Sequence, residues 1–456
     1  MKISTDQFDC AIKLARQIED IGGEGSQALI AGGAVRDAVM KREWHDVDIA
    51  TNVAVDVLEE NFKTNDIGQS REFGIVLVHF GDCDFEVAHF RADGNYDDGR
   101  HPDSVDLVNS FDEDAARRDF KMNALGMDVD GNIIDPHGGL DDIHNKVIST
   151  VGDPDKRFDE DYLRMLRAAR FAARYDFNID VETRDAIRRH AHKIVDMPSE
   201  RIYAELYKSA HDGGHQLARF VELLRELHLL EHVLPEIHAL IPLKHNYDFH
   251  PEGDVFPHVL ECLRASKSRE PYFNIAVLLH DVGKAVTYDF DEGRHSYKGH
   301  DRAGVAIIEQ MAARLKIPNV DRDIYAYTAE NHMKFHKLEE MSDRKIIELA
   351  HHKFWPELTH VGTCDEASRA HLFDPTALSR KLSHVARVVD RLGKKEELKE
   401  RIAQFITGHK VIKMRPDLQG SEIGSVMNLI KAALVDSGFS MTQEQVDDLI
   451  RFYANP

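Results

Sequence analysis

Two aspartates, Asp46 and Asp48, lie two residues apart between apolar neighbours in the stretch HDVDIATN. If this stretch is a strand, alternate side chains share a face, so both carboxylates point the same way. Two carboxylates held together repel each other unless a cation lies between them. Mg²⁺ takes one or two carboxylates together with substrate phosphates, and a pair of such ions can clamp the attacking and leaving oxygens of a phosphoryl transfer. The spacing therefore indicates phosphoryl chemistry that depends on divalent metals.

A glycine-rich turn precedes the two aspartates. Gly32 and Gly33 open the stretch GGAVRD, where backbone N–H groups could approach a phosphate at the start of the next helix. Arg36 could add a charged donor to the same triphosphate. An Asp-X-Asp pattern by itself usually marks two solvated acids on an amphipathic strand. The glycine turn and its arginine make the catalytic interpretation the better one.

A second charged cluster occupies the stretch RRDFKMNAL, which contains Arg118, Asp119 and Asn123. Guanidinium groups suit a triphosphate, and an Asp or Asn beside them could contact a ribose hydroxyl. The alternative is an exposed charged cluster at a helix start. Glu86, in the strand-like stretch DFEVAHF, is a rival candidate for a third metal-binding carboxylate.

The stretch EDYLRMLR holds Asp161 and Arg164 three residues apart, which predicts a shared helix face. A carboxylate accepts from an exocyclic amine, and an arginine donates to a ring nitrogen and a carbonyl oxygen. Cytosine and adenine both carry such an amine, so the pair could accept both bases and reject uracil and guanine. Arg167 would add a second contact. The alternative is an ordinary ion pair on a solvated helix.

Histidines beside acids recur in the C-terminal half, in FHPEGDVFPHVLE, VLLHDVGK, YKGHDRAG and AENHMKFH. His280 and Asp281 follow an apolar run, which predicts that both lie at a helix end and face inward. Imidazole and carboxylate together suit Mn²⁺, Ni²⁺, Fe²⁺ or Mg²⁺ better than a thiolate-type zinc site. With 27 histidines, one such pair would be expected by chance, but the ordered set indicates a second metal site.

The elements that must position these residues differ between the two ends of the chain. Strand-like runs between Gly and Asp, interrupted by helical patterns, predict an α/β or α+β unit at the N-terminus. From about residue 158 the apolar periodicity is helical and remains so to the end. The expected organisation is a head (1–150), a helical neck and body (151–245), a second metal domain (246–375) and a helical tail (376–456).

Composition limits the class of protein. A chain of 456 residues with 42% hydrophobic and 30% charged residues predicts a soluble protein of two to four compact units. No apolar run approaches the length of a membrane span, and the N-terminus lacks a signal-peptide core. Four scattered cysteines favour a reducing cytoplasm. The net charge of −22 argues against a nucleic-acid partner, although a local basic groove can override it.

Six motifs occur in a characteristic order: GGAVRD, HDVDIATN, FEVAHFRAD, RRDFKMNALGMD, DPHGGLDDI and EDYLRMLRAARFAARY. Over about residues 27–240 the series resembles the bacterial-type tRNA nucleotidyltransferase and poly(A) polymerase family. The resemblance implies a polymerase-β-like α/β head, followed by an all-α neck and body. It also implies transfer of a nucleotide from a nucleoside triphosphate to an RNA 3′-hydroxyl, with Mg²⁺ as cofactor.

The resemblance assigns the catalytic metals to Asp46 and Asp48, and gives Asp119 a sugar-binding or third-carboxylate role ahead of Glu86. The pair Asp161 and Arg164 corresponds to the family's amino-acid template, which selects CTP and then ATP. Tyr162 stands where the family usually has proline. The residues expected to bind the nucleotide are Gly33, Arg36, Arg118, Asn123, Asp161, Arg164 and Arg167.

The ordered histidines resemble an HD phosphohydrolase domain over about residues 246–370. The resemblance implies a divalent metal (Ni²⁺, Mn²⁺ or Mg²⁺) and phosphatase, 2′-nucleotidase or 2′,3′-cyclic phosphodiesterase activity. His300 and His332 would be further ligands or phosphate contacts. The expected ligands are His258, His280, Asp281 and, as the candidate for the last position, Asp365.

The sequence thus predicts a cytoplasmic enzyme that adds or repairs the 3′-terminal CCA of tRNA from CTP and ATP, with an appended HD hydrolase. Poly(A) polymerase and enzymes adding only CC or only A stay open. An RNA-binding protein without catalysis and a signalling phosphohydrolase with a vestigial head are disfavoured by the head aspartates and arginines. A locally basic helical region would be a seat for the acceptor arm or a solvated face; it consists of Arg170, Arg174, Arg188, Arg189 and Lys193.

Overall fold

The computed structural model describes residues 5–43, 47–65, 70–94, 105–246, 253–369 and 372–453. Asp46, predicted as a catalytic carboxylate, lies outside the described residues. The contacts divide the chain into two compact units, Met1–His238 and Ala239–Pro456.

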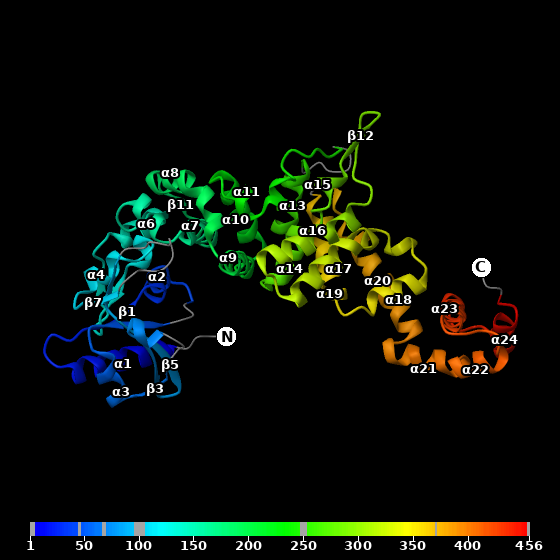
Figure 1. The fold of residues 1–456 in the computed structure, drawn as a ribbon, viewed down its shortest axis with the longest axis horizontal. Helices are drawn as coiled ribbons and strands as arrows, with labels where there is room; N and C mark the ends of the chain where they lie inside the picture. Colours follow the sequence, from blue (N-terminus) through cyan, green and yellow to red (C-terminus); the bar gives the residue numbers. More distant parts are fainter. Residues whose placement is uncertain are drawn as a thin grey trace. The chain divides into compact units, whose positions relative to one another are not determined.

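A seven-stranded sheet organises the N-terminal unit, in the order β3-β4-β5-β2-β1-β8-β9 (Figure 1). β2 pairs antiparallel with β1 and parallel with β5. Two small sheets, β6–β7 and β10–β11, stand apart from it. The sheet strands are β1 (Ala28–Ala31), β2 (Asp48–Thr51), β3 (Lys63–Asn65), β4 (Ile75–Phe80), β5 (Cys83–His89), β8 (Gly126–Met127) and β9 (Ile133–Ile134). The small sheets comprise β6 (Arg91–Asp93), β7 (Val105–Leu107), β10 (Val147–Ile148) and β11 (Asn178–Ile179).

Helices α1 (Thr5–Gly22) and α3 (Val55–Asn61) pack against the strands of this sheet. Helix α1 does so through four buried apolar residues that recur at three- and four-residue spacing. These residues are Ala11, Leu14, Ala15 and Ile18. Three further short helices belong to the sheet region: α2 (Gly33–Val39), α4 (Phe111–Ala116) and α5 (Gly139–Asn145).

The rest of the N-terminal unit is helical apart from β11. Helix α7 is buried on almost all sides and packs against α9 and α10. The helices are α6 (Pro154–Glu160), α7 (Leu163–Tyr175), α8 (Val181–His190), α9 (Ser199–His211), α10 (Gly214–Glu226), α11 (Leu230–Val233) and α12 (Pro235–His238). The predicted architecture, a polymerase-β-like α/β head followed by a helical body, is confirmed.

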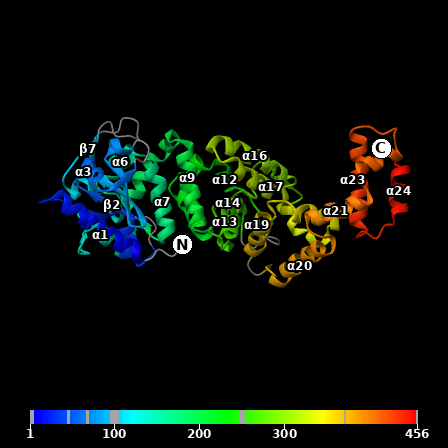
Figure 2. The ribbon, with the colours of Figure 1, turned by 90° about the horizontal axis from the view of Figure 1, so that it is seen from below.

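Five helices form the core of the C-terminal unit and lie together in both views (Figures 1 and 2). They are α13 (Val255–Ala265), α14 (Pro271–Leu279), α16 (His300–Leu315), α17 (Asn319–His336) and α19 (Trp355–Ser368). The short helix α15 (Lys284–Thr287) leads into a hairpin of β12 (Asp289–Asp291) and β13 (Arg294–Ser296), which interrupts the otherwise helical unit.

The remaining helices complete this unit. Helices α18 (Asp343–Ala350) and α20 (Pro375–Leu392) contact each other, and α23 and α24 lie side by side near the C-terminus (Figure 2). The others are α21 (Lys395–Phe405), α22 (Gly408–Met414), α23 (Ser421–Asp436) and α24 (Gln443–Arg451). Within the described part of the chain, no helix combines the length and the apolarity that crossing a bilayer requires.

Candidate active sites of the two units

A cavity of about 900 Å³ lies in the N-terminal unit, between the sheet and helices α7 and α9. Every described residue predicted to act in the head lines this one cavity. These are Gly33, Arg36, Asp48, Arg118, Asp119, Asn123, Asp161, Arg164 and Arg167. Residues far apart in the sequence therefore meet in one place.

Asp48 is the first residue of β2 and is exposed on the cavity wall. The parallel pairing of β2 with β5 sets Ile49 opposite Val87, so the register places Glu86 beside Asp48 on the neighbouring strand. Glu86 also lines the cavity. Two carboxylates on adjacent strands at one wall can share a divalent cation. Glu86, predicted as a weaker candidate than Asp119, is the acid that lies next to Asp48.

Two features favour glycine at position 32: its backbone conformation and the close approach of Arg118. Gly32 adopts a left-handed backbone conformation with φ of +73°, and a β-carbon there would come within 2.8 Å of the Arg118 guanidinium. The Gly32 N–H donates to the carbonyl of Leu125 at 2.9 Å. The turn therefore lets the arginine approach the backbone, and Gly33 then begins α2.

Arg36 is buried, and its guanidinium is held by protein groups. It donates to both oxygens of Asp37 at 2.9 and 3.0 Å and to the Asn123 side-chain oxygen at 2.5 Å. The same group lies 4.8 Å from the ring centre of Tyr175, within cation–π range. The arginine thus reaches the cavity wall in one fixed orientation.

Asp114, which the sequence analysis missed, orients two arginines of the cavity. One carboxylate oxygen accepts from Arg117 at 2.7 Å and the other from Arg118 at 2.9 Å. Burial acts to raise the pKa of Asp114, but the two guanidinium groups outweigh it and lower that pKa. The pair of cations suits a triphosphate.

Asp119 is buried and fully engaged in protein contacts. It accepts from the Phe120 backbone N–H at 2.8 Å, from Asn123 at 3.0 Å and from Arg167 at 2.7 Å. Although burial acts to raise the pKa of Asp119, Arg167 and these hydrogen bonds lower it to about 2. The geometry therefore suits an aspartate that positions Arg167.

The prediction that Asp161 and Arg164 share a helix face is wrong. Helix α6 ends at Glu160, Asp161 is extended, and α7 begins at Leu163. The Asp161 carboxylate accepts from the Leu163 N–H at 2.9 Å, so it caps α7 from outside the helix. Capping at this position requires a backbone that is not yet helical.

Three unpredicted residues hold this pair. Arg201 of α9 donates to the second oxygen of Asp161 at 2.9 Å. Arg164 pairs with Glu160 and donates to the Arg157 carbonyl at 2.9 Å. Both Asp161 and Arg164 still line the cavity. Arg201 lies forty residues along the chain, so no local pattern could have identified it.

The locally basic helical region is largely neutralised by neighbouring acids. Each of its five cations pairs with a carboxylate, at 2.6 Å between Arg189 and Asp155 and at 2.7 Å between Lys193 and Asp159. The others pair as Arg170–Glu205, Arg174–Asp212 and Arg188–Asp185. These pairs argue against a free phosphate-binding stripe, although the Arg170–Glu205 pair is buried rather than solvated.

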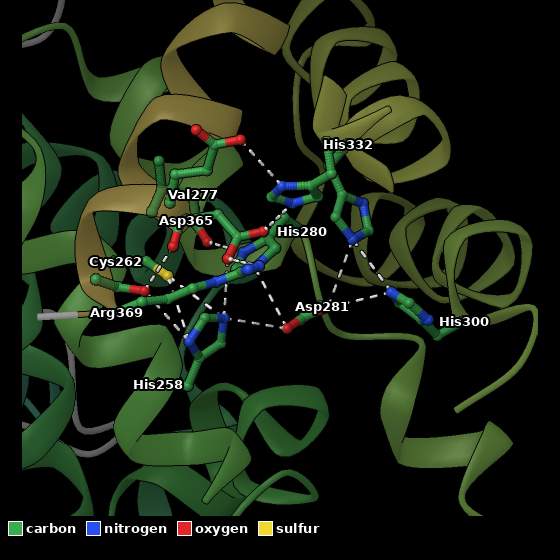
Figure 3. A network of polar contacts seen from close by, with 12 residues as sticks. His258, Cys262, Val277, His280, Asp281, His300, His332, Asp365 and Arg369 are labelled. Atoms are coloured by element: carbon green, nitrogen blue, oxygen red, sulfur yellow. Dashed lines mark hydrogen bonds and ion pairs between the residues drawn. The ribbon is translucent and has the colours of Figure 1, made fainter. Parts of the chain in front are cut away.

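A cluster of imidazoles and carboxylates lies at the centre of the C-terminal unit (Figure 3). Its ligand-type atoms fall into two groups, within each of which they lie no more than 4.8 Å apart. All of these side chains are buried. One group is His258, Cys262, His280 and Asp365, and the other is Asp281, His300 and His332. All six predicted residues are thus brought together.

The backbone fixes the orientation of three of the histidines. The Nδ1 atoms of His280, His300 and His332 lie 2.7, 2.8 and 2.7 Å from the carbonyl oxygens of Val277, Tyr297 and Ala329. A carbonyl only accepts, so each Nδ1 carries the proton and each Nε2 presents a lone pair. This arrangement is typical of metal-binding histidines.

Asp281 lies between the two groups. Its Oδ1 is 3.3 Å from His300 Nε2 and 3.6 Å from His332 Nε2. Its Oδ2 is 3.3 Å from His280 Nε2 and 3.6 Å from His258 Nε2. Burial acts to raise the pKa of Asp281, but the Lys284 ammonium and the histidines hold it well below its usual range. A carboxylate in this position can bridge two cations.

The residues fit divalent ions. Nε2 of His300 and Nε2 of His332 face each other at 3.1 Å, although both are acceptors in the neutral rings. His280 Nε2 and Asp365 Oδ1 are buried without a hydrogen-bond partner within the described residues. Buried polar atoms normally have partners, so this donor set calls for a cation. Cys262 lies one helical turn after His258, and burial raises the pKa of its thiol well above the usual value.

His336 hydrogen-bonds to Asp365 and to the neighbouring Glu366. Its Nε2 lies 2.7 Å from Asp365 and its Nδ1 3.3 Å from Glu366, so both ring nitrogens donate. Burial acts to lower the pKa of His336, but the two carboxylates raise it to about 9. Lys381 in turn pairs with Glu366. The sequence analysis missed this chain of contacts.

A cavity of about 530 Å³ opens onto the histidine cluster. Four cationic side chains line it, which favours an anionic ligand such as a phosphate. They are Lys284, Lys298, Lys337 and Arg369.

The chain thus has two candidate sites, an α/β head with carboxylates facing an arginine-lined cavity and a buried histidine–aspartate centre. Family models agree: the Poly A polymerase head domain matches residues 28–149, a probable RNA and SrmB-binding site of polymerase A matches 176–241, and the HD domain matches 256–422. Residues 28–149 are thus similar to the Poly A polymerase head domain and residues 256–422 to the HD domain, in the two regions where the motifs predicted them.

Curated relatives are CCA-adding enzymes. That of Geobacillus sp. (strain WCH70) is 45% identical over 192 residues, which cover 42% of this chain and 47% of the relative. That of Geobacillus kaustophilus (strain HTA426) is 40% identical over 237 residues, covering 52% and 57%. The chain spans about half the length of the curated relatives it matches.

Solved structures extend the similarity to the whole fold. The Bacillus stearothermophilus CCA-adding enzyme in complex with CTP aligns with a TM-score of 0.72 and 26% identity, over 98% of this chain and 97% of that one. A tRNA nucleotidyltransferase complexed with a primer tRNA and an incoming ATP analog aligns at 0.54 and 19%, over 83% and 98%, and supports the fold alone.

Proposed function

We propose that the head transfers nucleotides from CTP and ATP to the 3′ end of tRNA and so adds or repairs the terminal CCA. The observation that carries the proposal is one cavity that is lined by the adjacent carboxylates Asp48 and Glu86, by paired arginines and by Asp161. The relatives named as CCA-adding enzymes, one of them solved with CTP, support it.

Each part of the cavity has a role in the transfer. Asp48 and Glu86, with Asp46, would hold Mg²⁺, which supplies activation of the 3′-hydroxyl and neutralises charge on the α-phosphate. Arg117 and Arg118, which Asp114 orients, would bind the triphosphate. The hydroxyl oxygen bonds to the α-phosphorus, the bond to the β-phosphate oxygen breaks, diphosphate leaves and the hydroxyl proton goes to solvent. Asp161 and Arg164 would contact the base edge.

Product length tests the head proposal. The protein is incubated with tRNA transcripts that end before, within or after CCA, with labelled CTP or ATP. Defined completion of CCA is expected. Long A tails would indicate poly(A) polymerase, addition of C alone or A alone would indicate a specialised enzyme, and no incorporation would reject nucleotide transfer.

A second function is favoured by the buried histidine–aspartate centre. We propose that the HD domain hydrolyses phosphate esters, including 2′,3′-cyclic phosphates and 2′- or terminal phosphates at an RNA end. A bound divalent ion (Ni²⁺, Mn²⁺ or Mg²⁺) would supply an activated water. The water oxygen bonds to phosphorus, the ester P–O bond breaks, and the leaving oxygen takes up a proton. Lys284 and Arg369 line the cavity where the phosphate charge would lie.

The second function is tested with 2′,3′-cyclic AMP as substrate and with each ion added to the reaction in turn. Chromatography measures the adenosine monophosphate that is formed. His280→Ala is expected to abolish it, because His280 belongs to the buried ligand set. Equal rates for the wild type and His280→Ala would reject it. A cytoplasmic location fits both proposals, and all four cysteines are free.

A further inference from the structure

The hairpin of β12 and β13 presents two chemically different faces. Side chains alternate along a strand, so residues 288 and 290 share a face with residues 295 and 297. That face is entirely aromatic or imidazole: Tyr288, Phe290, His295 and Tyr297. The charged and polar residues lie on the other face: Asp289, Asp291, Arg294 and Ser296. The acids of the hairpin are therefore segregated from its aromatic face.

The rings of this face form a continuous series that leads to the metal-type cluster. From the cluster outward, His258 and His245 lie 5.5 Å apart between ring centres, and His245 and Tyr297 lie 5.9 Å apart. Tyr288 is 5.6 Å from Tyr297 and nearly parallel to His295 at 5.8 Å. Phe290 is the outermost ring, 4.9 Å from His295.

The outer part of the series is open to solvent. The hairpin projects away from the helices of the C-terminal unit (Figure 1). Phe290 is 55% exposed and Tyr288 is 44% exposed, whereas apolar side chains of this size are usually buried. Exposed aromatic groups beside a polar cavity are typical of a binding surface.

The hairpin is held firmly at the mouth of the cavity. His295 exchanges two backbone–side chain hydrogen bonds with Asn246, at 2.8 and 3.0 Å. The Tyr297 hydroxyl donates to the Lys244 carbonyl at 2.6 Å. His295, Tyr297 and Lys298 themselves line the cavity. The aromatic face and the cationic cavity therefore form one surface.

We propose that the β12–β13 hairpin is a base-stacking platform that delivers the 3′ end of a single-stranded RNA to the HD centre. Aromatic rings stack bases of any sequence, and cations beside them follow the phosphate backbone. Here the cations lie in the cavity and the rings continue outward from it, which matches a terminal phosphate followed by unpaired bases. The preferred substrate of the HD centre is thus an RNA end. This inference rests on the proposed hydrolase function.

Phe290 allows a selective test. A mononucleotide with its phosphate at the cluster would contact the inner rings, whereas only a longer strand would reach Phe290. Kinetics of the full chain are measured with 2′,3′-cyclic AMP and with a short oligoribonucleotide that ends in a 2′,3′-cyclic phosphate. Phe290→Ala is expected to raise the KM for the oligonucleotide about tenfold and to leave the mononucleotide unchanged.

Two controls sharpen the comparison. Phe290→Trp keeps a stacking ring and should retain the wild-type preference. Phe452→Ala removes an aromatic side chain that is 79% exposed and lines a different cavity, so neither substrate should respond. If Phe290→Ala affects both substrates equally, or neither, the platform is rejected and the exposed face serves another partner.

A crosslinking experiment separates failure of the platform from failure of the hydrolase. An oligoribonucleotide with 4-thiouridine next to its 3′ end is irradiated with the protein, and the modified peptides are mapped by mass spectrometry. Crosslinks to residues 288–297 would support the platform even if the wild type hydrolyses neither substrate. Crosslinks that avoid the hairpin would overturn it.

Discussion

The two candidate sites of this chain are built in opposite ways. In the head, Asp48 and Glu86 are exposed on the cavity wall, while the arginines around them are fixed by partners such as Asp114 and Asp119. In the HD centre the ligands themselves are buried, and backbone carbonyls fix their imidazoles. Under the proposed functions, the head fixes the groups that would meet a nucleotide, and the HD centre fixes the groups that would hold a metal.

The difference in burial predicts a difference in how readily each site exchanges its metal ion. Mg²⁺ keeps several waters and is usually bound through carboxylates and substrate phosphates together, so a site with exposed acids can load metal with each nucleotide. A buried set of imidazoles and carboxylates binds a resident ion. We therefore expect one exchangeable and one permanent metal site in the same chain.

Metal content should show the largest contrast. After dialysis without nucleotide, the wild type should retain about two divalent ions per chain, which the two ligand groups of the HD centre would hold. Asp281→Ala should lose both, because Asp281 approaches both ligand groups, and His300→Ala should lose one. Inductively coupled plasma mass spectrometry of the purified protein measures the number of metal ions per chain.

Asp48→Ala is the matched control for that experiment and should leave the metal content unchanged. If Asp48→Ala removed a resident ion, or Asp281→Ala removed none, the division into exchangeable and permanent sites would be wrong.

The next largest effect should come from the ion pair that positions Arg167. A fall in the Asp119 pKa from 3.8 to about 2 corresponds to about 2 kcal/mol of stability at neutral pH. The folded-state pKa lies below the unfolded value, so this stability is present above pH 4 and is lost as the pH falls toward 2. Asp119→Asn should therefore destabilise the head at pH 7, and the difference from the wild type should shrink across that window.

The full chain is unfolded in urea, and hydrogen exchange of the β1 and β8 amides is the readout. This readout measures the stability of the head separately from that of the C-terminal unit. Asp155→Asn is the control, because Asp155 pairs with Arg189 at the exposed surface and should cost much less. Equal losses for Asp119→Asn and Asp155→Asn would contradict the positioning role of the buried pair.

The smallest predicted effect concerns base selection. Arg201 holds the second oxygen of Asp161, so Arg201→Ala should let that carboxylate rotate. The ratio of kcat/KM for CTP to that for UTP should fall about tenfold, corresponding to about 1.4 kcal/mol of discrimination. Arg189→Ala, which removes a surface ion pair in the same unit, should leave the ratio unchanged. If Arg201→Ala leaves the CTP-to-UTP ratio of kcat/KM unchanged, the proposed role of Asp161 in base selection is rejected.

Local patterns predicted much of both sites. The alternation around Asp48 marked a strand, and the apolar run before His280 marked a helix that ends at the cluster, because both signals depend on neighbours in the chain. Cys262 could also have been predicted, since it follows His258 by one helical turn.

Residues that act from other elements could not be predicted. Arg201 and His336 reach their partners from helices far along the chain, and no spacing rule links them to Asp161 or Asp365. The break between α6 and α7 was missed for another reason. The helical apolar pattern continues across it, but the Asp161 side chain bonds the backbone and ends the helix locally.

A crossed pair of variants tests the central claim most directly: that one chain contains two independent phosphate-processing centres. Nucleotide incorporation into tRNA and hydrolysis of 2′,3′-cyclic AMP are measured for the wild type, Asp48→Ala and His280→Ala. We expect Asp48→Ala to lose incorporation and keep hydrolysis, and His280→Ala to do the reverse. Loss of both activities in either variant, or survival of incorporation in Asp48→Ala, would contradict the account.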